Sequence, residues 1–347
     1  LQRLPRRVTV EGATRMSKLI ALTGITGFVG MRIAEQALNS GYRVRATVRK
    51  REHGEKVRSL IEKGAATDGL EFVEANLLSD YGWDDAVAGA DYVIHTASPV
   101  ILGAVPDESV LFAPAVDGTK RVLEAAKNAQ VKKIVVTSTA LTIAGHISEG
   151  MATPADFTPA DDPRVTLYTK SKIAAEEVVL NFAAENPSGP EVVTIHPGVI
   201  IGPPLDPEED SESIALFRGI WSGAQPAVPD LPFPMADVRD VAHIHLAAMT
   251  SANTGTSRYM VSFTTDPQQF PDIARVLRRH GNKKAPRFTI PLTVLRVLAR
   301  FNSEIRMLVK STDGLSMRLD TSTTVKDFGW EPIPFEQSVL DTAKALK

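Results

Sequence analysis

The sequence predicts an α/β fold in which a doubly wound parallel sheet is followed by a smaller C-terminal α+β lobe. From Lys18 onward, short apolar runs alternate with segments of helical periodicity, which is typical of a parallel sheet with helices on both faces. The first apolar run ends at a glycine-rich turn that opens a helix. Beyond about Pro197 the alternation stops and the chain becomes rich in proline, which predicts a lobe of different construction.

The first half of the predicted sheet follows from the order of apolar runs and helix breakers. Lys18–Thr23 is an apolar run that breaks at Gly24, and we expect it to be a buried strand. In Met31–Ser40 the apolar residues fall on one helical face, and Gly41 ends the pattern. Tyr42–Val48 is the second expected strand. The third and fourth strands are expected at Glu71–Glu74 and Asp91–Thr96.

The second half of the predicted sheet continues the same alternation. Val116–Gln130 has apolar residues at helical spacing and is followed by Lys133–Thr137 (KIVVT), the fifth expected strand. Tyr168–Asn186 is a long expected helix, which ends before Pro187 because that residue cannot continue it. Val192–Ile195 is the sixth expected strand.

The remainder of the chain has a weaker pattern. One helix is expected at Val238–Thr250, with Asp237 as its N-cap and Asp240 three residues later in the position of a capping box. The acidic run Asp206–Glu212 is expected to be a solvated loop. The rest mixes short strands and helices without a repeat.

These patterns divide the chain into parts. We assign residues 17–200 to the main domain, to which 237–262 return, and residues 201–236 and 263–347 to the lobe. The lobe is expected to close over the carboxyl ends of the parallel strands, where α/β proteins bind ligands. Residues 1–16 are rich in arginine and are expected to be a disordered extension or a transit peptide outside the fold.

The composition narrows the class of protein. The 347 residues carry a net charge of −2, so no global field favours nucleic acid or an anionic membrane. The sequence has no cysteine, which excludes disulfides and thiolate metal sites and suits the cytoplasm. No apolar run approaches the ~20 residues of a membrane-spanning helix. We therefore expect a cytoplasmic protein with no nucleic-acid or membrane partner.

The glycine-rich turn Thr23–Gly30 (TGITGFVG) predicts a Rossmann-type dinucleotide site. Gly24 permits the tight turn, Gly27 lets the backbone approach a pyrophosphate, and Gly30 lets helix and strand pack closely. The alternative is an ordinary turn between a strand and a helix. We expect cofactor contacts from Gly24, Thr26, Gly27, Phe28, Val29 and Gly30.

The end of the second expected strand indicates which dinucleotide is bound. NAD-binding folds usually place an acid about 20 residues after the glycines, on the ribose hydroxyl. Here Tyr42–Arg51 contains five basic residues and no acid, and Arg49 stands where the acid is expected. A guanidinium can grip a 2′-phosphate bidentately, whereas a carboxylate repels it. NADP(H) is therefore favoured over the alternative of a solvated basic strand end.

Tyr168 and Lys172 lie one helical turn apart on the same face of the long helix. A nearby ammonium is expected to lower the tyrosine pKa from about 10, so that the phenol can protonate a carbonyl. The cluster Thr137-Ser138-Thr139, at the end of the fifth strand, can supply a third hydroxyl. The alternatives are that these hydroxyls cap a turn and that Tyr168 and Lys172 only pack or solvate.

The histidines give weaker signals. His243 and His245 are two residues apart on a helix and face different ways, so they are not a metal pair, and we expect no metal site. His95 and His196 sit at strand ends and are expected in the wall of the cofactor pocket rather than in catalysis.

Taken together, these motifs resemble the extended short-chain dehydrogenases/reductases. The similarity is greatest to the dihydroflavonol reductase-like branch, which includes cinnamoyl-CoA reductases, microbial aldehyde reductases and methylglyoxal reductases. It extends from Leu19 to about Leu346. The matching segments are TGITGFVG (23–30), GYRVRATVRK (41–50), VIHTASPV (93–100), VVTSTA (135–140), YTKSK (168–172), HPGVIIGP (196–203), DVRDVAHIHLAAM (237–249) and RYMVS (258–262).

The resemblance implies roles for individual residues. It makes Tyr168 the acid, Lys172 the ribose anchor and modifier of its pKa, and Thr139 the hydroxyl where the family commonly has serine. It directs Arg49 and Lys56 to the 2′-phosphate. It also implies cofactor contacts from Asn76, Leu77, Thr96, Ala97, Ser98, Thr137, Pro197, Gly198 and Val199.

Three departures from the family pattern bear on the substrate. The plant flavonoid enzymes carry an asparagine where this chain has Ala144, and the Asn-Trp-Tyr signature of cinnamoyl-CoA reductases is absent before Tyr168. The asparagine of a proton relay in many relatives corresponds to Ala115 or Asp117. A bacterial-type aldehyde or ketone reductase is therefore favoured over either plant specificity.

The resulting hypothesis is an NADPH-dependent reductase of aldehydes and ketones, with a homodimer as the expected assembly. The alternatives on the same fold are a sugar-nucleotide epimerase or dehydratase, a hydroxysteroid-type dehydrogenase, and a non-catalytic nicotinamide sensor. We expect the proline-rich segment 203–234 to set substrate choice. Its candidate pocket residues are Leu205, Leu216, Phe217, Trp221, Leu231 and Phe233. The alternative is that these residues do not contact substrate and only bury the lobe against the sheet.

Overall fold

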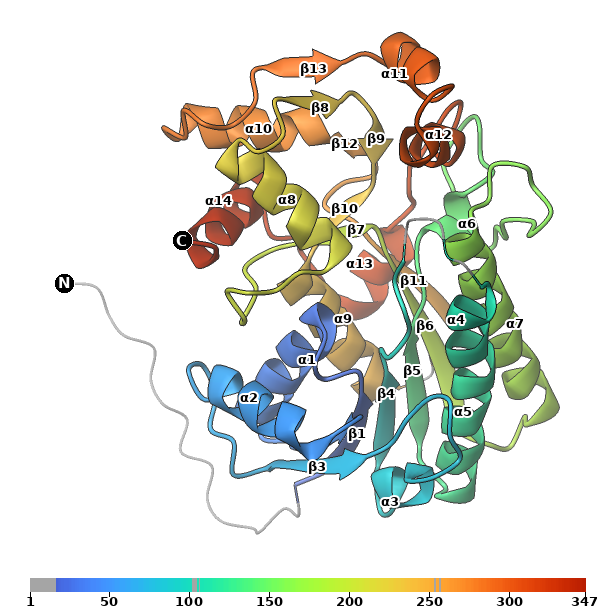
Figure 1. The fold of residues 1–347 in the computed structure, drawn as a ribbon. Helices are drawn as coiled ribbons and strands as arrows, with labels where there is room; N and C mark the ends of the chain where they lie inside the picture. The colour runs from blue at the N-terminus through green and yellow to red at the C-terminus, as the bar shows by residue number, and fades with distance from the viewer. Residues whose placement is uncertain (1–16, 102–104, 106, 253, 256) are drawn as a thin grey trace.

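A computed structural model describes residues 17–101, 105, 107–252, 254–255 and 257–347 (Figure 1). The expected N-terminal extension therefore lies outside the described residues. Seven parallel strands form the main sheet in the order β11-β6-β5-β4-β1-β2-β3. The strands are β1 (Leu19–Thr23), β2 (Arg43–Val48), β3 (Leu70–Glu74), β4 (Tyr92–His95), β5 (Lys133–Thr137), β6 (Glu191–Pro197) and β11 (Ser257–Val261).

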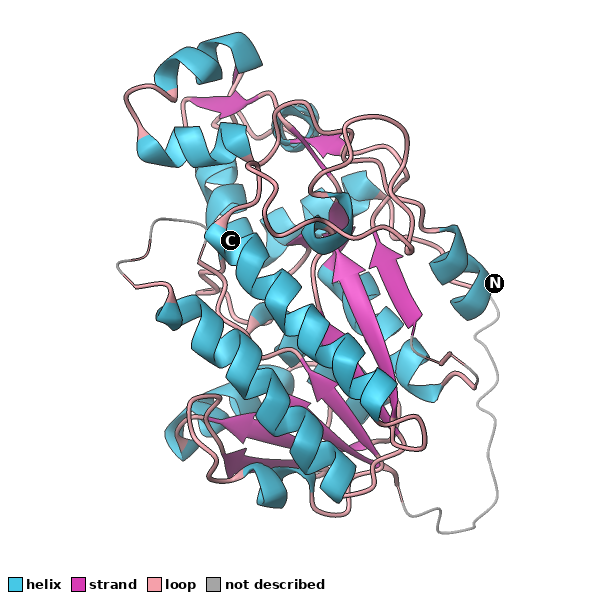
Figure 2. Cartoon of the chain, turned by 90° about the vertical axis from the view of Figure 1, so that its right-hand side faces the viewer, coloured by secondary structure: helices cyan, strands magenta, loops and turns pink. Residues whose placement is uncertain are grey.

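The strand order changes direction between β1 and β4, which confirms the predicted doubly wound sheet. The burial of β1 on both faces explains why the strand sequences are continuous apolar runs. Ile20 and Leu22 face one helical layer, whereas Leu19 and Ala21 face the other, and all four are buried. Helices cover both faces of the sheet, and Figure 2 shows the longer ones lying across its strands.

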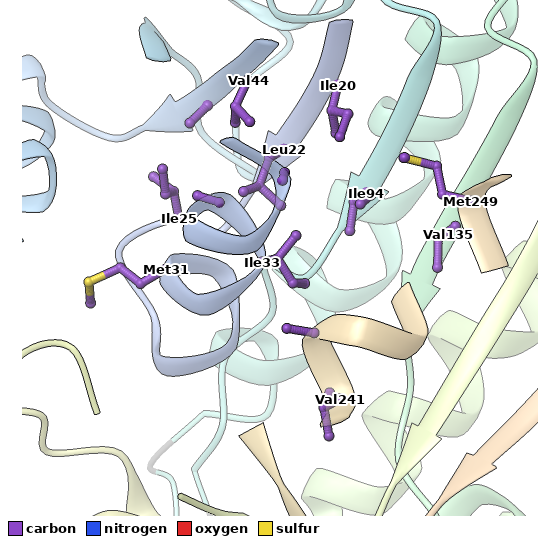
Figure 3. Packing of buried hydrophobic residues seen from close by; sticks show 14 of the residues in the cluster. Ile20, Leu22, Ile25, Met31, Ile33, Val44, Ile94, Val135, Val241 and Met249 are labelled. Atoms are coloured by element: carbon purple, nitrogen blue, oxygen red, sulfur yellow. The ribbon is translucent and has the colours of Figure 1, made fainter. Parts of the chain in front are cut away.

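One helical layer contains α1 (Phe28–Asn39), α2 (Arg51–Ile61) and α9 (Val238–Thr250), which share a core with the sheet. Figure 3 shows Ile33 of α1 and Val241 of α9 within this core. The other layer contains the helices α3 (Trp83–Val87), α5 (Gly118–Asn128) and α7 (Leu167–Glu185).

The structure differs from the sequence prediction at two helices. The helix expected from Val116 begins as a π-helical turn at Ala113–Asp117, which follows α4 (Ser109–Phe112). Asp237 caps α9 as predicted and accepts a hydrogen bond from the Arg239 amide. Asp240 does not complete a capping box, because its carboxylate accepts from the Ile333 amide instead.

The lobe is built on a second apolar core that includes Phe217, Ile273 and Val339. Its main helices are α8 (Glu212–Ser222), α10 (Phe270–Arg279), α11 (Leu292–Leu298), α12 (Ser303–Lys310) and α14 (Phe335–Ala345). Three small strand pairs join it: β7 (Val199–Ile201) with β10 (Met235–Asp237), β8 (Ala227–Pro229) with β13 (Phe288–Ile290), and β9 (Pro232–Phe233) with β12 (Gln268–Gln269). The short helices α6 (Leu141–Ala144) and α13 (Ser322–Phe328) complete the fold.

Candidate active site

The three glycines of the glycine-rich turn have different structural surroundings, so a side chain would have a different effect at each position. Gly24 has a φ of +80°, and a Cβ there would lie 2.8 Å from the Ala97 nitrogen. A Cβ on Gly30 would overlap the carbonyl of Gly24, so only glycine lets the start of α1 pack this closely. A Cβ on Gly27 would meet nothing nearer than 3.5 Å. Gly27 therefore leaves open space at the helix N-terminus.

This N-terminus is suited to an anion. Gly27 is the N-cap of α1, no side chain caps the helix, and its first turn contains no acidic residue. The first amides of a helix point outward and carry partial positive charge, so they fit a pyrophosphate. The turn is fixed to the end of β4, because the Thr96 hydroxyl donates to the Thr23 carbonyl (2.7 Å) and the Ala97 amide donates to the Thr23 hydroxyl (3.2 Å).

The basic residues expected at a 2′-phosphate lie in different surroundings. Arg49 is exposed directly after β2. Lys56 on α2 forms ion pairs with Asp206 (2.8 Å) and Glu208 (3.6 Å) in the loop that follows β7. The acidic run Asp206–Glu212 is therefore not simply a solvated loop, as the sequence suggested: the Asp206 side chain is only 13% exposed, and burial raises the pKa of Glu209.

The other predicted cofactor residues gather around the same edge of the sheet. Asn76 is exposed after β3, and its side chain accepts from the Leu78 amide. The Pro197 carbonyl accepts from the Ala140 amide, which ties β6 to the turn after β5. A Cβ on Gly198 would overlap the carbonyl of Pro234, so only glycine lets these two backbone segments approach so closely.

Tyr168 lies in the first turn of α7, whose N-cap Thr166 accepts from the Thr169 amide. Burial raises the pKa of Tyr168 to about 12, and a hydrogen bond with the Thr139 hydroxyl acts in the opposite direction. The structure therefore brings Thr139 and Tyr168 together. The neighbouring Ser138 points elsewhere, because its hydroxyl donates to Glu176 (2.7 Å).

Lys172 is one helical turn further along α7 and is only 6% exposed. Burial lowers its pKa to about 8, and the charge of Glu176 acts against this shift. We expected Lys172 to bring the pKa of Tyr168 below its usual range. In the chain alone the cost of burying the phenolate is larger, and the pKa is raised instead.

A buried ion pair that the sequence did not predict lies beneath these residues. Glu176 is four residues after Lys172 on α7, and its carboxylate accepts from Ser138 and from the Arg258 Nε of β11, both at 2.7 Å. Burial alone raises the Glu176 pKa, but His196, Arg258 and the hydroxyl hydrogen bonds outweigh it and leave the pKa lowered. The signal available in the sequence was an acid at helical spacing from Lys172.

Arg258 ties this network to a third segment. It donates to the carbonyls of Pro154 (2.8 Å) and Asp156 (2.6 Å) and stacks on the ring of Phe157, 3.9 Å from its centroid. The guanidinium of Arg258 on β11 therefore joins α7, through Glu176, to the loop after α6. Such a planar donor fork suits this role, since it can bond in several directions at once.

A small cavity of about 20 Å³ lies beneath Lys172, with Ala97, Ser98 and Thr119 among its lining residues. This volume holds about one water. His95 also lines the cavity, and burial lowers its pKa to about 3, with the charge of Lys172 acting in the same direction. Ala97 lines this cavity and lies against Gly24, so it stands between the glycine turn and the space beneath Lys172.

Two of the remaining histidines, His196 and His245, have structural partners. His196 is fully buried and lies 2.8 Å from the Thr194 hydroxyl and 3.1 Å from that of Thr142. His245 is buried and lies 2.8 Å from the Thr137 hydroxyl, whereas His243 is exposed. The two α9 histidines face different ways, as predicted.

The model of the NAD dependent epimerase/dehydratase family matches residues 20–262, which include the glycine turn, Tyr168 and Lys172. The chain belongs to this family. This confirms the resemblance inferred from the motifs, because the family comprises extended short-chain enzymes.

Among curated members, a putative uncharacterized oxidoreductase of Schizosaccharomyces pombe is 31% identical to this chain, with 95% of the chain and 97% of the relative covered. A cinnamoyl-CoA reductase of Medicago truncatula is 30% identical, with 77% and 82% covered. A ketoreductase of Cercospora beticola is 26% identical, with 94% of each chain covered.

Two solved structures of family-like enzymes share the fold. The yeast methylglyoxal/isovaleraldehyde reductase complexed with NADPH has a TM-score of 0.78 and 22% identity, with 95% of this chain and 98% of that chain covered. Vestitone reductase from alfalfa has a TM-score of 0.71 and 22% identity, with 94% and 97% covered. These likenesses show that the chain shares their overall fold.

Proposed function

We propose that this chain is an NADPH-dependent reductase that converts aldehydes or ketones to alcohols. The observation that carries the proposal is the placement of the Thr139 hydroxyl against Tyr168, beside the buried Lys172, at the edge of the sheet where the glycine turn lies. Curated relatives at 30% and 26% identity are named cinnamoyl-CoA reductase and ketoreductase, which supports the same reaction type.

The cofactor is proposed to bind along the carboxyl edge of the sheet. Gly24–Gly30 and the N-terminus of α1 fit the pyrophosphate, and Arg49 offers an uncommitted guanidinium to a 2′-phosphate. Lys172 is proposed to hold the nicotinamide ribose. When bound, the reduced nicotinamide supplies the hydride. A relative in the fold comparison is an NADPH complex, which supports this choice of dinucleotide.

Tyr168 is proposed to donate the proton that the carbonyl oxygen needs. A pKa of about 12 keeps the phenol protonated at neutral pH, so it is available as an acid. Thr139 is placed to orient the same oxygen with its hydroxyl. Lys172, with a pKa of about 8, is mostly charged at neutral pH and favours the phenolate that proton donation leaves behind.

The substrate is proposed to be a small or medium-sized carbonyl compound bound between the sheet edge and the lobe. Of the predicted pocket residues, Phe217 and Leu231 are almost fully buried in lobe cores, so for these two the alternative of simple packing applies. Leu216, Trp221 and Phe233 are partly exposed at the surface of these cores and remain the candidates for contact with substrate.

Reduction is favoured over epimerisation or dehydration of a sugar nucleotide. The basic end of β2 lacks the acid typical of enzymes that retain NAD, and the curated relatives named above are reductases or an oxidoreductase. Of the described helices, none is long and apolar enough to cross a bilayer. We propose a cytoplasmic location because the sequence has no cysteine and therefore no disulfide, which suits a reducing compartment.

The decisive experiment is a panel of aldehydes and ketones, each followed by the loss of NADPH absorbance and repeated with NADH. We expect turnover of several carbonyl compounds with a clear preference for NADPH. A chain that binds NADPH but reduces no member of the panel contradicts the proposal. A chain that interconverts sugar nucleotides without net consumption of cofactor favours epimerisation.

A further inference from the structure

Positive charge is concentrated in one segment of the lobe. Residues 275–310 contain ten lysines and arginines and one acid, whereas the rest of the chain has 29 basic and 40 acidic residues. The net charge of −2 for the whole chain therefore conceals a strongly cationic segment in an acidic protein. Such asymmetry is typical of a surface that meets an anionic partner.

The segment runs from α10 through β13 and α11 to α12, and Figure 1 shows β13 and α11 at the outer edge of the lobe. Three of its cations are neutralised, since Arg275, Arg279 and Arg296 form ion pairs with carboxylates. Five further exposed cations form no ion pair with a described residue. They are Lys283, Lys284, Arg287, Arg300 and Lys310.

The same segment carries an exposed apolar stripe. On α11 and the turn that continues it, Val294, Val297, Leu298 and Phe301 recur at the spacing of one helical face, and they are 46%, 50%, 38% and 85% exposed. The helix already buries a different face through Leu295 and Ala299 in the lobe core. A second apolar face is therefore left to solvent, which marks a docking surface.

The strand that precedes α11 carries another exposed apolar residue. Phe288 on β13 is 73% exposed and is adjacent in sequence to Arg287. Arg300 borders the stripe, because it lies three residues after Val297, about 60° from it in helical projection, whereas Arg296 lies on the opposite side of α11 and is paired with Asp313. The long apolar stem of Arg300 allows its charged end to reach away while the stripe stays in contact with an apolar phase.

The combination of charge and apolar area selects one class of partner. Nucleic acid would engage the cations through its phosphates but would gain little from Val294, Val297 and Leu298, the aliphatic residues of the stripe. In a two-fold dimer the same surface meets itself, so a second copy of this chain would bring the unpaired cations of both copies together. An anionic lipid surface complements the cations with its headgroups and the stripe with its acyl boundary.

We propose that residues 275–310 form a docking surface for an anionic lipid bilayer, in which α11 places Val297, Leu298 and Phe301 at the headgroup boundary. The chain would lie on the bilayer without crossing it. This differs from the sequence-based expectation of no membrane partner, which used the net charge of the whole chain. The inference goes beyond the proposed reductase activity and does not depend on it.

The test is sedimentation of the full chain, saturated with NADPH, with vesicles of phosphatidylcholine alone or mixed with phosphatidylglycerol. We expect binding to the mixed vesicles, little binding to phosphatidylcholine alone, and weaker binding as salt is raised. Absence of binding to the mixed vesicles at low salt overturns the proposal.

Variants separate the two components of the surface. Arg287→Glu and Arg300→Glu should each weaken binding at least roughly fivefold, and Val297→Ser with Phe301→Ser should weaken it about tenfold. The matched controls are Lys326→Glu, an exposed cation on α13, and Tyr81→Ser, an aromatic residue that is 76% exposed far along the chain from the surface. Both controls should bind vesicles as the parent chain does.

Unchanged cofactor binding and thermal unfolding in all variants show that the fold is intact, whether or not the chain proves to be a reductase. Equal losses in the controls overturn the proposal, as does binding that none of the four surface changes weakens. Self-association that Val297→Ser with Phe301→Ser abolishes, without vesicle binding, would make the stripe an interface between copies. Loss of DNA binding on charge reversal, without vesicle binding, would make the segment a nucleic-acid surface.

Discussion

At the scale of single residues, the proposed proton transfer depends on two hydroxyls: Tyr168 donates the proton, and Thr139 orients the carbonyl oxygen that receives it. Tyr168→Phe removes only the acid, so NADPH binding should stay nearly intact while turnover falls by about 10²-fold or more. The rate of NADPH absorbance loss measures turnover, and fluorescence titration with NADPH measures cofactor binding. Ser138→Ala is the matched control, because the Ser138 hydroxyl bonds to Glu176 rather than to Tyr168. Near-normal turnover in Tyr168→Phe contradicts the catalytic assignment.

Arg49 should decide the choice of dinucleotide. Its replacement by Asp removes a charge-assisted contact worth about 1.5–3 kcal/mol, which corresponds to more than tenfold in NADPH preference. Lys56→Ala should have a smaller effect, because Lys56 is already paired with Asp206. The kcat/KM values for NADPH and NADH measure the preference. A parent enzyme that prefers NADH is incompatible with this prediction.

Glu176 should set the alkaline limit of activity. Burial lowers the Lys172 pKa to about 8, and the Glu176 charge raises it, so Glu176→Gln should lower that pKa further. Turnover that depends on charged Lys172 falls as pH rises through this pKa, so the alkaline limb of the profile should move to lower pH. The pH profile of kcat measures the shift. An unmoved limb in a folded variant shows that Glu176 acts on structure alone.

The same buried lysine gives a stability effect of definite sign. Its pKa in the folded chain is below the ordinary value of 10.5, so between about pH 8 and pH 10.5 the unfolded chain binds the extra proton. The Lys172 contribution to the free energy of unfolding therefore rises with pH across this window. A separate loss of stability is expected at Arg258, because Arg258→Met leaves the buried Glu176 carboxylate without its arginine partner, a change worth about 3–5 kcal/mol.

At the scale of elements, the junction of β1 and α1 separates a folding role from a binding role. Gly27→Ala places its methyl in open space at the helix N-terminus, whereas Gly30→Ala forces the methyl against the Gly24 carbonyl. We expect Gly30→Ala to lower the melting temperature and Gly27→Ala to leave it unchanged. Gly27→Ala should instead weaken NADPH binding, because its methyl occupies the approach of the pyrophosphate. Thermal unfolding with and without NADPH distinguishes the two.

At the scale of the whole molecule, the lobe lies over the edge of the sheet and is expected to select the substrate. Trp221→Ala and Phe233→Ala should each shift relative kcat/KM between bulky and small carbonyl compounds by about 1–3 kcal/mol. Phe217→Ala is the contrasting variant, because Phe217 is fully buried in the lobe core and its loss should reduce stability instead. If both surface variants keep the parent ranking of substrates, specificity lies outside this segment.

The sequence by itself determined the parallel sheet and the position of its motifs. Continuous apolar runs, glycine breakers and helical periodicity are local properties, so β5 at Lys133–Thr137 and α9 at Val238–Thr250 have the predicted bounds. Boundaries shifted where local signals were weak, as at the π-helical turn before α5. The glycine turn, Tyr168 and Lys172 could be recognised because their chemistry requires fixed spacings.

Only the tertiary structure decided which distant residues meet. Glu176 and Arg258 are 82 positions apart, and no local pattern indicates that β11 brings the guanidinium beneath α7. The same holds for Lys56 and Asp206, and for the division of the lobe residues between core and surface. Burial also reversed the expected pKa shift of Tyr168, because the cost of desolvating a phenolate depends on everything packed around it.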